Sequence, residues 1–219
     1  DHMVLQRDLP VPVWGRADAG QVVVVEFAGQ SVEAKAADDG RWQVRLEPME
    51  ANAAGRVMRI RSVPGEDPAV IRDVLVGEVW FSGGQSNMAY TTGQMARRLP
   101  EGRILVEGAQ LGGIRLRKVN ERDARLPQDD LTGGSWHVCN PGSVVNHSAV
   151  AFVFARRLHQ ELGVPLGIID CSWGGTPIEP YIPFEAFTGH PTLEKLAAFA
   201  KAGDINAVRR LPGGTFARS

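Results

Sequence analysis

Residues 73–88, which read DVLVGEVWFSGGQSNM, decide the fold class because an apolar run passes directly into a glycine-rich turn. The run VLVGEVWF at 74–81 is almost continuously apolar, as is typical of a strand covered on both faces of a parallel sheet. Gly83 and Gly84 allow a tight turn, and Ser86 follows at the expected start of a helix. This order predicts an α/β domain whose turn residues project from the carboxyl edge of the sheet, where such sheets bind ligands.

The chain beyond this turn continues the alternation of strand and helix. IRLRKV at 114–119 predicts a second strand, SAVAFVFARRLHQELG at 148–163 a helix, and PLGIIDCS at 165–172 a third strand. Ser148 is the predicted N-cap of this helix, and Gly163 its predicted end. The apolar stripe of the helix is expected at Val150, Val153, Phe154, Leu158 and Leu162.

Residues ahead of the turn carry a different pattern. Short runs rich in β-branched residues alternate partly between apolar and polar, which predicts a small antiparallel sandwich. These runs are VPVW (11–14), QVVVVEF (21–27), SVEAKA (31–36), RWQVRL (41–46) and RVMRIRSV (56–63). In RWQVRL, Trp42, Val44 and Leu46 share one face, and DDG at 38–40 predicts a hairpin with the preceding run.

This change of pattern predicts two domains. Residues 1–72 are expected to form the β-sandwich-like domain, and residues 73–219 the α/β domain, which closes with a predicted helix over 191–203. VPGEDPAV at 63–70, rich in proline and acids, lies close to the expected boundary.

Composition excludes several functional classes. The net charge of −1 and the lack of a like-charge block argue against nucleic acid and against an anionic membrane surface. The chain has no apolar run of membrane-spanning length and no visible signal peptide. Its two cysteines, Cys139 and Cys171, are expected to be separate thiols, and no cluster has metal-ligand spacing.

Ser86 has two interpretations. A serine in a tight turn at the carboxyl edge has the placement of a nucleophile. Serine and asparagine are also the commonest helix caps, and spacing alone favours this second interpretation for Ser86 or Asn87. The G-x-S-x-G pattern of the familiar nucleophile elbow is not present.

SWGGTPIE at 172–179 forms a second turn that also comes after a strand. Its paired glycines expose backbone amides, which suit an oxyanion hole. A plain turn and a phosphate-binding loop are the alternatives, although neither phosphate-loop motif is present. Trp173, beside the glycines, is placed either to contact a bound ligand or to pack in the core.

These segments together resemble the sialate O-acetylesterase family of carbohydrate esterases, which belongs to the SGNH-hydrolase group. The resemblance rests on GEVWFSGGQSNM, on SAVAFVFARRLHQELGVPLGIIDCSWGGTPIEPYIP, and on the opening β-rich segment with DDGRWQVRL. It implies an SGNH-like (flavodoxin-like) parallel sheet with helices behind a small antiparallel β-sandwich.

The resemblance also implies roles for individual residues. Ser86 matches the nucleophile, and its own backbone N–H would be one oxyanion donor. The turn Gly174, Gly175 and Thr176 matches the segment lining the opposite side of the site, with Gly175 as the second donor. Glu179 matches an acidic position after the turn, and Gln85 and Asn87 match the motif as supports of the turn.

The chain departs from the family pattern after the second turn. A QGE-x-N block and a D-x-x-H-like block, which supplies the general base, are absent from these 219 residues. The resemblance therefore implies an α/β domain incomplete at its C-terminus, completed by a further segment or a second chain. The five histidines, His2, His137, His147, His159 and His190, are weak candidates for the base. His159 is expected to be solvated on the polar side of its helix, and packing is the expected role of His147.

The predicted function is hydrolysis of acetyl esters on sugars, of the sialate or plant-glycan type, through a serine acyl-enzyme. No cofactor or metal is expected, and an acetylated carbohydrate is the expected partner. The alternative is an inactive carbohydrate-binding or structural protein that keeps the esterase fold. A secreted or periplasmic location is implied by the resemblance alone.

Overall fold

The computed structural model describes residues 1–63, 67–120, 131 and 133–176, with isolated positions at 186, 189, 191, 194 and 198. The strands are β1 (Val4–Gln6), β2 (Val11–Arg16), β3 (Val22–Phe27), β4 (Gln30–Lys35), β5 (Arg41–Leu46), β6 (Asn52–Val63), β7 (Ala69–Gly84), β8 (Leu111–Lys118), β9 (Trp136–Cys139) and β10 (Leu166–Ser172). The helices are α1 (Ser86–Ala89), α2 (Thr92–Arg98), α3 (Pro100–Glu107), α4 (Pro141–Val144) and α5 (Ala149–Leu162). The predicted helix over 191–203 lies outside the described residues except at isolated positions.

The N-terminal strands form the predicted antiparallel sandwich. Strands β4, β3, β6 and β7 pair in that order, and β2 pairs with β5 in a separate two-stranded sheet. One apolar core joins the two sheets, with Val23, Val25 and Phe27 on one side and Val44 and Leu46 on the other. Alternation along β5 buries Trp42, Val44 and Leu46, as the sequence predicts.

The prediction of a hairpin at DDG, between β4 and β5, is wrong. A tight turn is present, since the Ala37 N–H donates to the Arg41 carbonyl and Gly40 has a φ of +79°. However, β4 pairs with β3, whereas β5 pairs with β2. The chain changes sheets at this turn because the apolar face of β5 is buried across the sandwich instead of beside β4.

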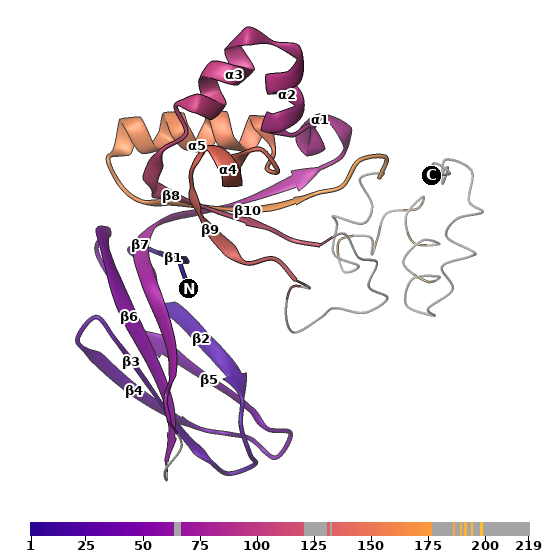
Figure 1. Cartoon of the computed structure of the whole chain (residues 1–219). Helices are drawn as coiled ribbons and strands as arrows, with labels where there is room; N and C mark the ends of the chain where they lie inside the picture. Colours follow the sequence, from indigo (N-terminus) through magenta and orange to yellow (C-terminus); the bar gives the residue numbers. More distant parts are fainter. Residues whose placement is uncertain are drawn as a thin grey trace.

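Strand β7 connects the sandwich to the α/β part of the molecule (Figure 1). Its first half pairs with β6 and β1, and its second half pairs with β10. The expected boundary at 72/73 lies inside this strand, so one continuous backbone ladder runs through both parts. The division into two domains stays a prediction.

The α/β part has the predicted parallel sheet. Strands β7, β10 and β8 are parallel neighbours, and β9 pairs antiparallel at the edge. Figure 1 shows the helices gathered on one side of this sheet. Phe152 and Ala155 of α5 pack there against Ile114, Leu166 and Ile168 of the strands.

Helix α5 begins and ends as predicted but buries a different face. The Ser148 hydroxyl accepts a hydrogen bond from the Ala151 N–H, and Gly163 is left-handed at the end. The predicted stripe is largely exposed, with Val150 53% and Phe154 42% accessible. The smaller residues Ala151 and Ala155 face the sheet instead, together with Phe152, because small side chains permit a close approach.

The end of β7 is less covered than its apolar sequence predicts. Val74, Leu75 and Val76 are buried, but Trp80 is 43% exposed and Phe81 64% exposed. Trp80 meets the edge of Phe154, with ring centroids 5.1 Å apart. The prediction that the run 74–81 is covered on both faces is therefore wrong at Trp80 and Phe81 within the described part of the chain, where the helices lie on one face.

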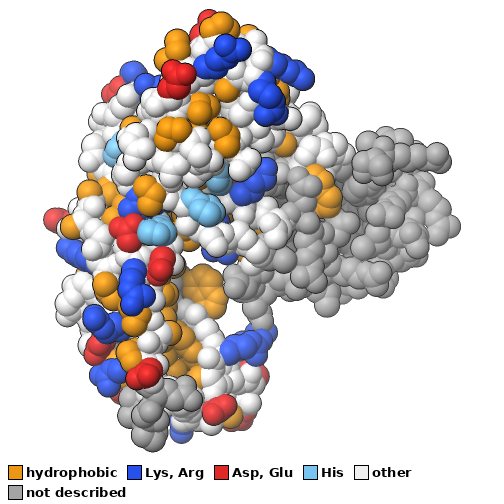
Figure 2. Space-filling view, in the orientation of Figure 1, with side chains coloured by type: hydrophobic (Ala, Val, Ile, Leu, Met, Phe, Trp, Pro, Cys, Tyr) orange, Lys and Arg blue, Asp and Glu red, His pale blue; other side chains and the backbone are white. Residues whose placement is uncertain are grey.

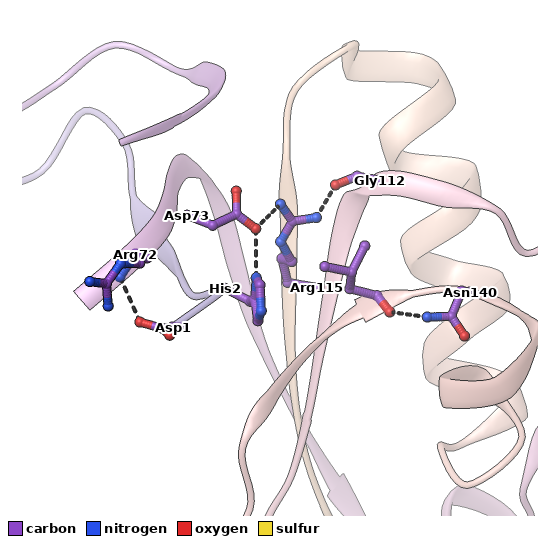
Figure 3. A network of polar contacts seen from close by, with 8 residues as sticks. Asp1, His2, Arg72, Asp73, Gly112, Arg115 and Asn140 are labelled. Carbon is purple, nitrogen blue, oxygen red and sulfur yellow. Dashed lines mark hydrogen bonds and ion pairs between the residues drawn. The ribbon is translucent and has the colours of Figure 1, made fainter. Parts of the chain in front are cut away.

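An ionic network joins the two parts of the molecule where β7 passes between them (Figure 3). The Asp73 carboxylate lies 2.7 Å from Nδ1 of His2 and 2.9 Å from an Nη of Arg115. Arg115 belongs to β8, its side chain is only 5% exposed, and it also donates to the Gly112 carbonyl. The network ties the N-terminal segment, β7 and β8 together.

Candidate active site

The two predicted turns lie side by side at the carboxyl edge of the parallel sheet. Ser172 at the end of β10 pairs in register with Gly84 at the end of β7. The Trp173 N–H donates to the Gly84 carbonyl at 2.9 Å, which extends the ladder into both turns. A side chain at Gly174 would lie 4.0 Å from Cα of Ser86. The structure therefore brings Ser86 and the Gly174–Gly175 turn together.

Glycine is needed at specific positions of these turns. Gly84 has a φ of +144°, and a Cβ there would lie 3.1 Å from Cβ of Met88. Gly175 has a φ of +78°, and no atom lies within 4 Å of its Cβ position. Glycine is therefore needed there because of the backbone conformation and not because of crowding. Both glycines lie in the two turns that meet at this edge, and Ser86 stays exposed between them.

Ser86 is exposed at the first position of α1. Its neighbour Gln85 is the N-cap, with the side-chain carbonyl oxygen 2.9 Å from the Ser86 backbone nitrogen. The same oxygen lies 2.7 Å from the Ser86 hydroxyl oxygen. An oxygen of a carbonyl group thus already sits against both the N–H and the hydroxyl of Ser86. The cap that the sequence assigned to Ser86 or Asn87 is Gln85 instead.

A buried carboxylate supports the second turn from behind. Asp170, near the end of β10, has no solvent exposure. It accepts hydrogen bonds from the Ser172 hydroxyl at 2.5 Å, from the Ser172 N–H at 3.1 Å and from the Ser148 N–H at 3.1 Å. Asp170 therefore fixes the start of the glycine turn relative to the start of α5.

The start of α5 is in turn attached to the segment just after Ser86. The Ser148 hydroxyl lies 3.4 Å from the sulfur of Met88, and the Ala149 N–H donates to the Tyr90 carbonyl. The buried Thr92 donates through its hydroxyl and its N–H to the His147 carbonyl. Both turns are consequently held by one set of contacts around Asp170 and Ser148.

His147 lies next to this set, and no hydrogen bond joins it to Ser86, whose hydroxyl contacts Gln85. It is 4% exposed, and its Nδ1 has no hydrogen-bond partner among the described residues. Burial lowers the pKa of His147 to about 4; Asp170 opposes this shift, whereas Lys118 and His137 add to it. A neutral imidazole at ordinary pH is expected, which agrees with the prediction that packing explains this residue.

The other described histidines also form no hydrogen bond with Ser86. His2 pairs with Asp73, and His159 contacts the Val164 carbonyl through Nδ1 at 2.7 Å. His159 is half-buried over Gly113, so the prediction of a solvated side chain is wrong. His137 is exposed on β9, and His190 lies outside the described residues.

The remaining predicted residues lie around the turns. Thr176 closes the second turn by donating from its hydroxyl to the Trp173 carbonyl at 2.7 Å. Trp173 is half-buried, and Asn87 is exposed on α1. Glu179 lies outside the described residues. Cys139 and Cys171 are both free thiols, as predicted, and burial raises the pKa of each to about 12.

Sequence reasoning missed Asp170. The only available signal was an acid at the end of the apolar run PLGIID, where a buried strand rarely carries a charge. Its partner Ser148 lies 22 residues earlier, so the pair forms only when β10 and α5 pack.

Comparison with known proteins places this arrangement in a family. No family model matches the chain. Sialate O-acetylesterase of Rattus norvegicus is 31% identical over 194 residues, which make up 82% of this chain and 35% of the rat protein. The chain belongs to the sialate O-acetylesterase family. The Homo sapiens sialate O-acetylesterase is likewise 31% identical over 196 residues, or 83% of this chain and 37% of the human protein.

A solved structure supports the same family. A carbohydrate acetylesterase from Xanthomonas citri matches with a TM-score of 0.78 and 34% identity, over 95% of this chain and 46% of that one. The predicted fold class is thereby confirmed. The chain spans just over a third of the length of the sialate O-acetylesterases it matches.

Proposed function

We propose that this chain carries the nucleophile half of a carbohydrate O-acetylesterase site, with Ser86 as the nucleophile. The observation that carries the proposal is that the Gly174 turn lies beside Ser86 across two adjacent strand ends, so that a Cβ at Gly174 would lie 4.0 Å from Cα of Ser86. A serine and a turn of exposed amides at one sheet edge suit acyl transfer, because the same site presents both an attacking oxygen and oxyanion donors.

The reaction has two halves. The Ser86 oxygen forms a bond to the acetyl carbonyl carbon, and its proton passes to a base; the sugar hydroxyl then leaves with that proton. Water attacks the acetyl-enzyme, acetate leaves, and Ser86 regains its proton. The Ser86 N–H and a backbone N–H of the Gly174–Gly175 turn stabilise the oxyanion in each half.

Gln85 has a specific part in this cycle. Its side-chain oxygen contacts the Ser86 nitrogen at 2.9 Å and the hydroxyl oxygen at 2.7 Å, where an ester carbonyl has to bind. Substrate binding therefore displaces the Gln85 amide from the Ser86 N–H. The amide holds the turn in shape until the substrate arrives.

We assign the base to a histidine outside the described residues. Among the described residues no hydrogen bond joins a histidine to Ser86, whose hydroxyl contacts Gln85, and His147 is buried with a pKa of about 4. A segment outside this sequence or a second chain contributes the base. The substrate is an acetylated carbohydrate, with sialic acid and plant glycans such as xylan as the candidate classes.

The acetyl-enzyme provides the test. The protein as encoded in full is mixed with an acetylated sugar, quenched in acid during turnover and digested, and the peptide that contains Ser86 is weighed. We expect one acetyl group on Ser86 and none on this peptide from the Ser86→Ala variant. Turnover with the acetyl group on another residue would refute the assignment.

An inactive sugar-binding protein is the second candidate function. The hydrogen bond between the Ser86 hydroxyl and the Gln85 side chain favours it. A Gln85 amide that never leaves would block the ester carbonyl. Sugar binding without acetate release, by both the wild-type protein and Gln85→Ala, would support this candidate over the esterase.

The location of the protein belongs to the same proposal. Within the described residues, no helix is long and apolar enough to cross a membrane. We place the protein outside the cytoplasm, secreted or periplasmic, where acetylated glycans occur. Fractionation of its native cells, with blotting of the medium and periplasm, tests this placement.

A further inference from the structure

A fully buried carboxylate lies behind both turns of the proposed site. Figure 2 shows Asp and Glu side chains at the surface, several of them beside Lys or Arg, whereas Asp170 has no solvent exposure. Within the described part of the chain Asp170 forms no ion pair, and its hydrogen-bond donors are neutral N–H and hydroxyl groups. Burying an unpaired charge is costly, so a carboxylate here indicates a requirement that a neutral side chain does not meet.

The requirement is for acceptors on both oxygens of the side chain. Oδ1 of Asp170 accepts from the hydroxyl and from the N–H of Ser172, and Oδ2 accepts from the Ser148 N–H. An asparagine side chain has the same shape, but its amide offers one acceptor oxygen and replaces the other with an NH₂ donor. With that side chain, the N–H of either Ser172 or Ser148 would face a donor and lose its hydrogen bond.

The two oxygens are connected to the two halves of the site. Ser172 is the last residue of β10 and lies just before the Gly174–Gly175 turn, so Oδ1 holds the strand end from which this turn begins. Ser148 contacts the sulfur of Met88, which lies in α1 two residues after Ser86, so Oδ2 holds the residue that packs against this helix. One buried side chain therefore links the glycine turn to the helix that carries the proposed nucleophile.

We infer that Asp170 is a positioning residue for the esterase reaction, which sets the place of the Gly174–Gly175 amides relative to Ser86. The inference rests on the proposed function. Amides aimed at the developing oxyanion stabilise the transition state more than the bound ester, so misplaced amides lower kcat and leave KM nearly unchanged. The charge of Asp170 by itself acts in the opposite direction, because a negative group behind the turn repels a forming oxyanion.

Steady-state kinetics of the protein as encoded in full, with an acetylated sugar, tests this inference. In Asp170→Asn we expect kcat to fall about thirtyfold, with KM within about twofold of the wild-type value. Ser172→Ala removes one donor and keeps the carboxylate, so its kcat should fall less, by about threefold. The matched control Asp73→Asn changes another carboxylate that joins separate elements, near the start of β7, and should leave kcat unchanged.

Amide hydrogen exchange supplies a readout that does not depend on activity. The Ser172 N–H donates to Asp170 and the Trp173 N–H donates to the Gly84 carbonyl, so both amides are protected in the folded protein. In Asp170→Asn their exchange should become about tenfold faster, because the strand end loses part of its support. The amides of β3 in the sandwich should exchange at the wild-type rate.

Three kinetic results would overturn the inference: a kcat of Asp170→Asn equal to or above the wild-type value, an equal loss of kcat in Asp73→Asn, or a raised KM with kcat kept. If Asp170→Asn does not fold, an unchanged kcat in Ser172→Ala overturns it instead. The esterase assignment fails separately, by acetate release from Ser86→Ala at the wild-type rate. Unchanged exchange at Ser172 and Trp173 in Asp170→Asn would then still refute the positioning of the turn.

Discussion

At the scale of single residues, the site depends on what touches Ser86. Its placement beside Gly174 was predictable, since both turns come after parallel strands and such strands end at one edge. The support from Asp170 was not, because its hydrogen bonds reach Ser148 and Ser172 only in the packed structure. The sequence also could not show that Gln85, rather than Ser86 or Asn87, caps α1.

Gly174→Ala tests the space beside the nucleophile. The new methyl group would lie 4.0 Å from Cα of Ser86, an ordinary contact, so the fold should tolerate it. The methyl group would reduce the space proposed for the acetyl group of the substrate. We therefore expect kcat/KM to fall about tenfold or more, with little change in Tm. Steady-state kinetics with an acetylated sugar and a thermal melt measure the two effects. An unchanged kcat/KM would show that the acetyl group does not bind there.

His147 predicts how stability depends on pH. Its folded pKa of about 4 lies below the ordinary value of 6.5, so between these values the unfolded chain binds a proton that the folded chain does not. Stability should therefore fall as the pH drops from 6.5 to 4, by on the order of 3 kcal/mol. Urea unfolding across this range should show a flatter dependence in His147→Phe than in His137→Phe. Equal slopes would contradict the assignment.

At the scale of secondary-structure elements, boundaries were more predictable than packing. Ser148 and Gly163 fix the ends of α5 because capping is local. Its buried face was predicted wrongly because the helix is apolar on two sides, and size alone does not tell which side meets the sheet. The partner of β5 was likewise decided by burial across the sandwich and not by the turn that precedes it.

The close approach of β7 to the residue before β10 gives an element-scale prediction. A Cβ at Gly77 would overlap the Pro165 carbonyl, which accepts a hydrogen bond from the Glu78 N–H at 2.9 Å and is not free to move. Gly77→Ala should lower the free energy of unfolding by about 1–3 kcal/mol or more.

Gly112→Ala is the matched control, since nothing lies within 4 Å of its Cβ position. It should leave stability equal or slightly raised, because alanine restricts the unfolded chain. Urea unfolding of both variants measures the difference. Equal stability of the two variants would contradict the crowding at Gly77.

At the scale of the whole molecule, the single strand β7 runs through both the sandwich and the α/β part. The sequence shows the change from β-rich to α/β pattern near residue 72, but β7 runs through it from Ala69 to Gly84. Strand length is set by the partners on each side, β6 and β1 first and β10 later, which a single sequence does not reveal.

The network around Asp73 should stabilise this junction. Asp73→Asn keeps a residue that tolerates the positive φ of 53° but removes the charge opposite His2 and the buried Arg115. We expect a loss of about 2 kcal/mol, less than for a fully buried pair because the Asp73 side chain is 32% exposed. Urea unfolding should show no loss in the exposed control Asp67→Asn. Equal stability of the two variants would mean that the network does not hold the parts together.

The role of Ser86 as the nucleophile is tested by the rate of acetate release from an acetylated sugar, compared between the wild-type protein as encoded in full and its Ser86→Ala variant. We expect a fall of about a thousandfold or more with an unchanged Tm, because the reacting oxygen is lost from an exposed turn that does not support the core. Acetate release by Ser86→Ala at the wild-type rate would contradict this role.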